Sequence, residues 1–151
     1  MKYEMIVFDW DGTILDSAGA IVRAIQAACR DLGVVVPSDR QASHVIGLGL
    51  LDAMRHAVPD LAPEKHRGMA DRYRFHYLSG DHELTLFNGI REMLERLQSA
   101  GHILTVATGK SRLGLDRALA YSGLAPLFQA SRCADECHSK PHPQMLEELM
   151  A

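Results

Sequence analysis

The sequence lacks the features of a membrane protein, a secreted protein or a nucleic-acid-binding protein. Its 151 residues contain no apolar run long enough to span a bilayer, and its first residues do not form a signal-peptide pattern. The formal net charge of −3 provides no basic surface for a nucleic acid or an anionic membrane. These absences predict a cytoplasmic protein that binds neither nucleic acid nor membrane.

Cysteine is also scarce, with residues only at Cys29, Cys133 and Cys137. This odd count does not suggest a disulfide framework and favours a reducing compartment. Cys133, Cys137 and His138 could be imagined as a metal cluster, but a fourth ligand is not apparent and the spacing fits no common zinc pattern. We therefore expect free thiols.

The apolar residues that are present follow the spacing of strands and of helices in turn. Strands are predicted at residues 4–9, 103–107 and, more weakly, 127–131. Helices are predicted at residues 16–32, 38–46, 50–57, 63–78, 90–100, 111–122 and 142–150. Because strands that alternate with helices form parallel sheets with right-handed crossovers, we expect an α/β fold. Residues 16–84 form an almost wholly helical insertion after the first strand.

The most informative stretch is the end of the first strand, where Asp9 and Asp11 follow the apolar residues 6–8. Side chains alternate along an extended segment, so both carboxylates point to one side and Trp10 to the other. Ligands of open α/β sheets bind at this end of the strands. Two neighbouring carboxylates repel each other unless a cation lies between them, and Mg²⁺ is the usual solution for oxygen ligands. The alternative is a strand end followed by an acidic turn.

Two further stretches supply groups for a phosphate. The second strand ends at Thr108 and Gly109, which should lie beside the aspartates because neighbouring parallel strands end together. The Thr108 hydroxyl and the free amides at the next helix start suit a phosphate oxygen. Lys140, followed by two prolines, is the best candidate for a fixed cation. Taken alone, a Thr-Gly pair is usually structural and a lysine is usually a surface charge.

Together the three stretches resemble the first three motifs of the haloacid dehalogenase-like superfamily, most of whose members are Mg²⁺-dependent phosphatases. The resemblance implies that Asp9 is the nucleophile, which forms an aspartyl-phosphate, and that Asp11 is the general acid and base. It also implies that Asp9 and the Asp11 carbonyl hold Mg²⁺. Thr108, the Gly109 amide and Lys140 would hold the phosphoryl oxygens.

The resemblance also implies a domain organisation. Residues 1–15 and 85–151 would form a Rossmann-like α/β core, and residues 16–84 a helical cap that closes over the site and selects the substrate. Gly47-Leu48-Gly49 resembles a cap loop of phosphoglycolate phosphatase-like and β-phosphoglucomutase-like members, although a plain helix break is an equally good account. The basic residues of the last cap helix indicate either a solvated face or recognition of an anion.

One family feature is missing. Members continue with another strand that ends in an acidic pair and completes the Mg²⁺ site, and residues 141–151 contain no such pair. We therefore expect a truncated form whose sheet has about three strands. The first strand would then have a bare side, and an exposed apolar edge strand invites pairing with another chain. A homodimer through this edge is predicted.

The implied activity is that of a Mg²⁺-dependent phosphomonoester hydrolase acting on a small phosphorylated metabolite, similar to phosphoglycolate. Three alternatives stay open. A dehalogenase of the same superfamily generally lacks the second aspartate, which is present here as Asp11. A phosphomutase differs in cap details that the sequence does not resolve. The third alternative is a catalytically impaired or non-enzymatic module that lacks the complete metal site.

Overall fold

Three strands form one parallel sheet in the computed structural model, which describes residues 2–151. The sheet order is β1 (Met5–Phe8), β2 (Ile103–Thr108) and β3 (Ala130–Cys133). Phe8 lies opposite Val106, and Thr108 lies opposite Cys133, so the three strands end at the same edge of the sheet. The predicted α/β fold with a three-stranded parallel sheet is confirmed.

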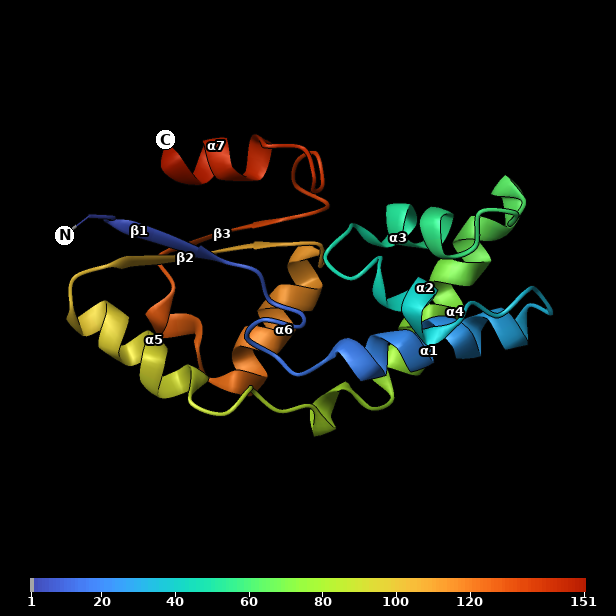
Figure 1. The fold of residues 1–151 in the computed structure, drawn as a ribbon, viewed down its shortest axis with the longest axis horizontal. Coiled ribbons are helices and arrows are strands. Elements are labelled where there is room, and N and C mark those ends of the chain that lie inside the picture. Colours follow the sequence, from blue (N-terminus) through green and yellow to red (C-terminus); the bar gives the residue numbers. More distant parts are fainter. Residues whose placement is uncertain (1) are drawn as a thin grey trace.

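Helices cover both faces of this sheet (Figure 1). The helix α7 (Gln144–Met150) lies on one face, and α5 (Ile90–Ser99) and α6 (Arg112–Ser122) lie on the other. We call the sheet with these three helices the α/β part. Its core consists of buried side chains from the strands, from the helices and from the turn after β1: Trp10, Ile14, Leu94, Leu104, Val106, Leu115, Leu124 and Cys133.

Four further helices lie at the other end of the elongated molecule (Figure 1). They are α1 (Ala18–Asp31), α2 (Asp39–Ser43), α3 (Leu50–Ala57) and α4 (His66–Leu78), and we call them the helical part. This part has a separate core, in which α1 packs against α4 around residues such as Ile25, Met54 and Met69. Short 3₁₀ turns connect the elements at Pro63–Lys65, Asp81–Glu83 and Ala125–Leu127.

The sequence placed most elements correctly, but the third strand was wrong in its bounds. Residues 127–131 were predicted as a strand, whereas β3 begins at Ala130. Pro126 lies in a 3₁₀ turn that continues to Leu127 and delays the strand. Phe128 then packs edge-on against Phe8 and Trp10, with ring centroids 6.3 Å apart in both pairs. The apolar run therefore reflects core packing of a connecting segment.

Two large apolar side chains of α5 and α6 lie at the surface. The exposed fractions of Met93 and Tyr121 are 37% and 64%. Tyr121 instead lies under the Arg117 guanidinium, 5.1 Å from its ring centroid, which is a common arrangement for an exposed aromatic side chain.

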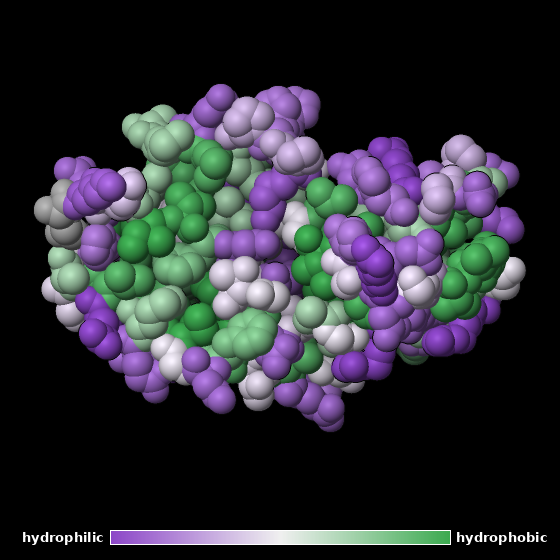
Figure 2. Space-filling view, in the orientation of Figure 1, coloured by the Kyte–Doolittle hydropathy of each residue, from purple (hydrophilic) through white to green (hydrophobic). Residues whose placement is uncertain are grey.

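The strand β1 forms an edge of the sheet, since within residues 2–151 it pairs only with β2. All four of its residues keep an intermediate exposure. Figure 2 shows an apolar surface over this strand, between α5 and α7.

Within residues 2–151, no helix combines the length and the apolarity needed to cross a membrane.

Candidate active site

Asp9 and Lys140 meet at the C-terminal edge of the sheet. Asp9 directly follows β1, and its Oδ1 atom accepts a hydrogen bond of 2.7 Å from the Trp10 backbone N–H. The Lys140 Nζ atom lies 3.0 Å from the same Oδ1 atom and donates to the Ala107 carbonyl at 3.3 Å. One lysine from the loop before α7 therefore joins the ends of β1 and β2. We call this cluster the Asp9 half of the site.

Asp11 lies in a second cluster with a different lysine. Its Oδ1 atom accepts a hydrogen bond of 2.7 Å from the Ser17 hydroxyl, and the Lys110 Nζ atom lies 3.4–3.5 Å from its two carboxylate oxygens. The side chains of Asp11 and Lys110 are only 11% and 12% exposed. We call this cluster the Asp11 half. The two carboxylates thus bind separate cations, while Trp10 points into the core with no exposed area.

Ser17 links the start of the helical part to the Asp11 half. Ser17 occupies the N-cap position of α1, but its side chain makes no capping hydrogen bond. The buried hydroxyl donates to Asp11 instead. A hydrogen bond to a charged acceptor is stronger than one between neutral groups, so the hydroxyl stabilises the Asp11 carboxylate.

Thr108 and Gly109 lie where the sequence predicted, at the end of β2. Thr108 has no exposed area, and its Oγ1 atom accepts a hydrogen bond of 3.1 Å from the Lys110 backbone N–H. The loop of the helical part lies directly on Gly109. A Cβ atom there would clash with the Leu48 carbonyl and lie 2.6 Å from the Gly47 carbonyl. Only glycine allows this close approach of two backbones.

The loop of Gly47, Leu48 and Gly49 therefore belongs to the site. Gly47 has a φ of +97°, and a Cβ atom there would lie 3.3 Å from Asp9 Oδ2 and 3.7 Å from Lys140 Nζ. A second link joins the same regions, since the Ser139 hydroxyl donates to Asp52 Oδ2 at 2.9 Å. A plain helix break does not account for a loop that contacts the Asp9 half.

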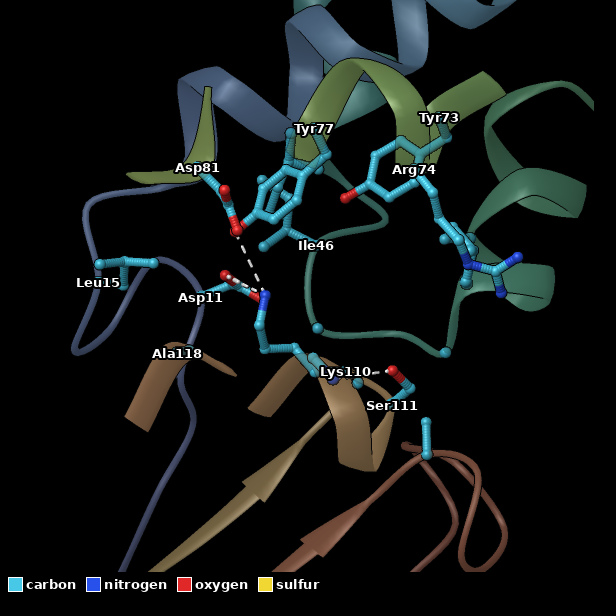
Figure 3. A pocket seen from close by; sticks show the side chains of 18 of the residues that line it. Asp11, Leu15, Ile46, Tyr73, Arg74, Tyr77, Asp81, Lys110, Ser111 and Ala118 are labelled. Carbon is cyan, nitrogen blue, oxygen red and sulfur yellow. Dashed lines mark hydrogen bonds and ion pairs between the residues drawn. The ribbon is translucent and has the colours of Figure 1, made fainter. Parts of the chain in front are cut away.

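Lys110 is a member of the site that the sequence reasoning missed. Its ammonium donates to the Tyr77 hydroxyl at 3.3 Å and lies 4.8 Å from the centroid of the Tyr77 ring (Figure 3). Burial lowers the pKa of Lys110, but the Asp11 carboxylate and the Tyr77 hydroxyl together raise it by more. Burial raises the pKa of Tyr77, because it disfavours the charged phenolate. The signal available in the sequence was a lysine directly after the Thr-Gly pair.

A cavity of about 1030 Å³ separates the helical part from the α/β part. Asp11 and Lys110 line it, whereas Asp9 and Lys140 do not, within residues 2–151. Most of the wall is apolar, and it includes Ile25, Tyr73 and Tyr77 from the helical part and Leu86, Ala118 and Tyr121 from the α/β part. Figure 3 shows Tyr73, Tyr77 and Arg74 of α4 on the wall above Lys110.

The basic residues of α4 divide between structure and site. Arg72 and His76 both contact the Asp31 carboxylate of α1, at 2.6 Å and 2.7 Å, and therefore join two helices of the same part. Arg74 instead lines the cavity and keeps 56% of its side chain exposed. Of these three side chains, only that of Arg74 is placed to meet a ligand.

The donor chemistry fits a magnesium ion that is shared with a phosphate. Mg²⁺ usually keeps several waters and takes one or two carboxylates together with phosphate oxygens. Asp9 and the Asp11 backbone oxygen supply such donors at the end of β1. No group of three or more His, Cys, Asp or Glu side chains in the described chain could hold a metal by itself. The cysteines are free thiols, as predicted.

Comparison with known proteins agrees with this geometry. The haloacid dehalogenase-like hydrolase family matches residues 6–151. A phosphoglycolate phosphatase of Aliivibrio fischeri is 32% identical, over 97% of this chain and 69% of its own length. A 5′-nucleotidase of Pseudomonas aeruginosa is 35% identical, over 73% of this chain and 50% of its own length. The chain thus spans between half and about two thirds of these two relatives.

Solved structures show the same fold. The crystal structure of a predicted phosphoglycolate phosphatase from Haemophilus somnus 129PT superposes with a TM-score of 0.84 and 25% sequence identity. The match covers 99% of this chain and 71% of that one. The parallel sheet, the aspartates after β1 and the family match over nearly the whole chain agree, and the protein is a member of the haloacid dehalogenase-like hydrolase family.

Proposed function

We propose that the protein is a phosphatase that hydrolyses phosphate monoesters through a covalent intermediate on Asp9. The observation that carries this proposal is the 3.0 Å contact between Asp9 Oδ1 and Lys140 Nζ at the C-terminal edge of a parallel sheet. A carboxylate nucleophile needs a nearby cation, because its negative charge otherwise repels the phosphate that it attacks. The relatives named as phosphatase and nucleotidase support the same reaction class.

In the first step an Asp9 carboxylate oxygen attacks phosphorus, and the bond from phosphorus to the ester oxygen breaks. Asp11, which must enter this step protonated, gives its proton to the leaving oxygen. In the second step water attacks phosphorus, the bond to the Asp9 oxygen breaks, and Asp11 takes the proton of the water. Inorganic phosphate leaves. Lys140, the Thr108 hydroxyl and the Gly109 amide hold the phosphoryl oxygens through charge-assisted contacts.

The proposed cofactor is Mg²⁺, which would be held by the Asp9 carboxylate and the Asp11 backbone oxygen. When bound, it neutralises charge that otherwise keeps carboxylate and phosphate apart. The residues of the chain then orient the ester. The leaving group would lie in the cavity, because Asp11 lines the cavity and Asp9 does not.

The proposed substrate is a small phosphorylated metabolite, with phosphoglycolate as the first candidate because of the Aliivibrio fischeri relative. Residues 16–84 would form a cap, and residues 1–15 and 85–151 the core that it covers. Its loop at Gly47 already lies against Asp9 and Lys140. A cavity of about 1030 Å³ also admits larger leaving groups, which makes nucleoside monophosphates the second candidate.

The test is hydrolysis of p-nitrophenyl phosphate with Mg²⁺ and with a chelator, by the wild type, by Asp9→Asn and by Asp60→Asn. Asp60 is an exposed residue of the helical part and serves as the matched control. We expect Mg²⁺-dependent turnover that Asp9→Asn abolishes and Asp60→Asn leaves unchanged. Turnover by Asp9→Asn would refute the nucleophile. Absence of turnover by the wild type would favour a non-enzymatic module.

A substrate panel separates the remaining alternatives. It contains phosphoglycolate, nucleoside 5′-monophosphates and β-glucose 1-phosphate, and it measures released phosphate and isomerised product. A phosphatase releases phosphate from its substrate. A phosphomutase of the same family would isomerise the sugar phosphate, and that product would overturn the assignment as a hydrolase.

A further inference from the structure

Lys110 connects the two parts of the molecule at the Asp11 half. Its Nζ atom lies 3.5 Å and 3.4 Å from the Oδ1 and Oδ2 atoms of Asp11, which belongs to the α/β part. The same atom lies 3.3 Å from the Tyr77 hydroxyl of α4, in the helical part. With 12% of its side chain exposed, Lys110 has left bulk water for these two partners.

We propose that Lys110 is a positioning residue that holds the Asp11 carboxylate toward the leaving group while Tyr77 covers it. This inference rests on the proposed phosphatase function. It assigns Lys110 no contact with the phosphoryl group, which distinguishes its role from that of Lys140. It also makes α4 part of the general-acid machinery, because the Tyr77 ring covers the ammonium from the cap side.

The distances indicate orientation of the carboxylate. Charge-assisted N–H···O bonds are typically about 2.7–2.9 Å long, and the two contacts between Lys110 and Asp11 are longer and nearly equal. An ammonium that bridges both oxygens in this way fixes the carboxylate plane without occupying either oxygen in a short bond. The Ser17 hydroxyl donates to Oδ1 at 2.7 Å. Oδ2 is therefore the oxygen better placed to exchange a proton with a ligand.

Tyr77 makes this arrangement depend on the helical part. Its ring stacks on Tyr73 with centroids 5.9 Å apart and an interplanar angle of 17°, and both rings pack against the core shared by α1 and α4. The ring is thus fixed by the packing of its own part. Lys110 lies 4.8 Å from the centroid of this ring, where a cation is attracted to the aromatic face. The ammonium loses this cover if α4 moves away.

The experiment compares two esters that differ in their need for an acid. The p-nitrophenolate group leaves without a proton, whereas the alkoxide of phosphoglycolate needs one. The value of kcat/KM reports only the steps up to formation of the Asp9 intermediate, and proton transfer to the leaving group belongs to these steps. We expect Lys110→Met to lower kcat/KM on phosphoglycolate about 10- to 100-fold, with less than about a threefold change on p-nitrophenyl phosphate.

Further variants keep the inference falsifiable. Lys110→Arg keeps the charge and should restore much of the activity on the alkyl ester. Tyr77→Leu removes the ring from α4 and should also lower kcat/KM more on phosphoglycolate than on p-nitrophenyl phosphate, but by less than Lys110→Met. If Lys110→Met does not fold, Tyr77→Leu replaces it in the test. Lys65→Met, at an exposed lysine of the helical part, is the matched control and should change neither ester.

Two results would overturn the inference. One is an equal loss of kcat/KM on both esters by Lys110→Met, which would indicate phosphate binding or general disorder of the site. The other is unchanged activity on the alkyl ester. Failure of the proposed function has a different signature, namely no turnover of either ester by the wild type or undiminished turnover by Asp9→Asn.

Discussion

The α/β part and the helical part contribute to the site in different ways. The Asp9 half is built from the α/β part, with Asp9 after β1 and Lys140 before α7, and both side chains keep about a third of their area exposed (32% and 29%). The Asp11 half is buried, with 11% and 12% exposure for Asp11 and Lys110, and it includes Tyr77 of the helical part. At the proposed nucleophile the helical part contributes only the backbone of Gly47, whereas at the proposed acid it contributes the Tyr77 side chain.

This difference has a chemical consequence. A nucleophile must meet a charged, hydrated phosphate, and an open site at a sheet edge permits this. A general acid works best where water is excluded and its orientation is fixed. The low exposure of Asp11 and its contacts with Ser17 and Lys110 suit such a role. Variants in the two halves should therefore differ in kind, the first affecting all substrates and the second mainly those with poor leaving groups.

The largest effect is expected from Lys140→Met. Loss of the fixed cation beside Asp9 should lower kcat/KM about 10²- to 10³-fold on every ester, by analogy with loss of one donor from an oxyanion site. Steady-state kinetics on p-nitrophenyl phosphate and phosphoglycolate measure it. If Lys140→Met affected only the alkyl ester, the division of the site into two halves would be wrong.

Gly47→Ala should come next, because it places a methyl group 3.3 Å from Asp9 Oδ2 at a φ of +97°. Gly33→Ala is the matched control, since Gly33 also has a positive φ of +63° but no atom within 4 Å of the added carbon. Both variants should lose about 1–2 kcal/mol of stability from backbone strain. Only Gly47→Ala should also lower kcat/KM, about tenfold, as thermal unfolding and kinetics together would reveal.

A smaller effect is expected from Ser17→Ala. Its buried hydroxyl donates to Asp11 at 2.7 Å, and removing a hydrogen bond to a charged group costs about 2 kcal/mol of unfolding free energy. Denaturant titration measures this loss, with the exposed Ser43→Ala as the control. The loss of kcat/KM should be larger for phosphoglycolate than for p-nitrophenyl phosphate. An equal loss of kcat/KM on both esters would show that Ser17 does not act through Asp11.

The sequence predicted the α/β part better than the contacts between the two parts. Asp9 follows β1 and Thr108 ends β2, and the apolar runs of these two strands are strong local signals, so their position at one sheet edge followed from parallel pairing. In the helical part, the bounds of the helix Leu50–Ala57 were also predicted correctly, because Gly49 precedes it and Val58-Pro59 follow it. Local patterns therefore sufficed for residues at the ends of neighbouring strands and for helix boundaries.

The Asp11 half could not be predicted in the same way. The contact between Lys110 and Tyr77 joins residues 33 positions apart on different parts, and no local pattern encodes how the parts meet. Tyr77 packs against the core of the helical part and also reaches the site. Ser17 occupies the N-cap position of α1, yet its hydroxyl donates to the Asp11 carboxylate. Tertiary packing decided between these local alternatives.

The free edge of β1 extends the comparison to assembly. The homodimer predicted from this edge involves only the α/β part, and we expect a dimer of the 151-residue chain by light scattering at micromolar concentration. Met5→Lys should shift it toward monomer, because a charge on an edge strand opposes pairing. Leu113→Lys, at an 81% exposed position of α6, is the control. A monomer at all concentrations would contradict this prediction.

The smallest effect concerns acid stability of the helical part. Hydrogen bonds from His76 and Arg72 lower the pKa of Asp31 below its usual range. A carboxyl whose pKa is lower in the folded state stabilises the protein above its unfolded pKa of about 3.9, and this contribution is lost as the pH falls through the folded pKa. The melting temperature should therefore fall below about pH 4, and Asp31→Asn should flatten that decline.

Glu136 provides the matching test in the α/β part. Arg112 lowers the pKa of its carboxyl through a hydrogen bond, and the Cys133 backbone N–H adds a second one. By the same sign argument Glu136→Gln should also flatten the acid limb of the melting curve. If the two parts unfold together, Asp31→Asn and Glu136→Gln lower one shared transition at neutral pH. Two separate transitions, each moved by one variant, would show that the parts unfold independently.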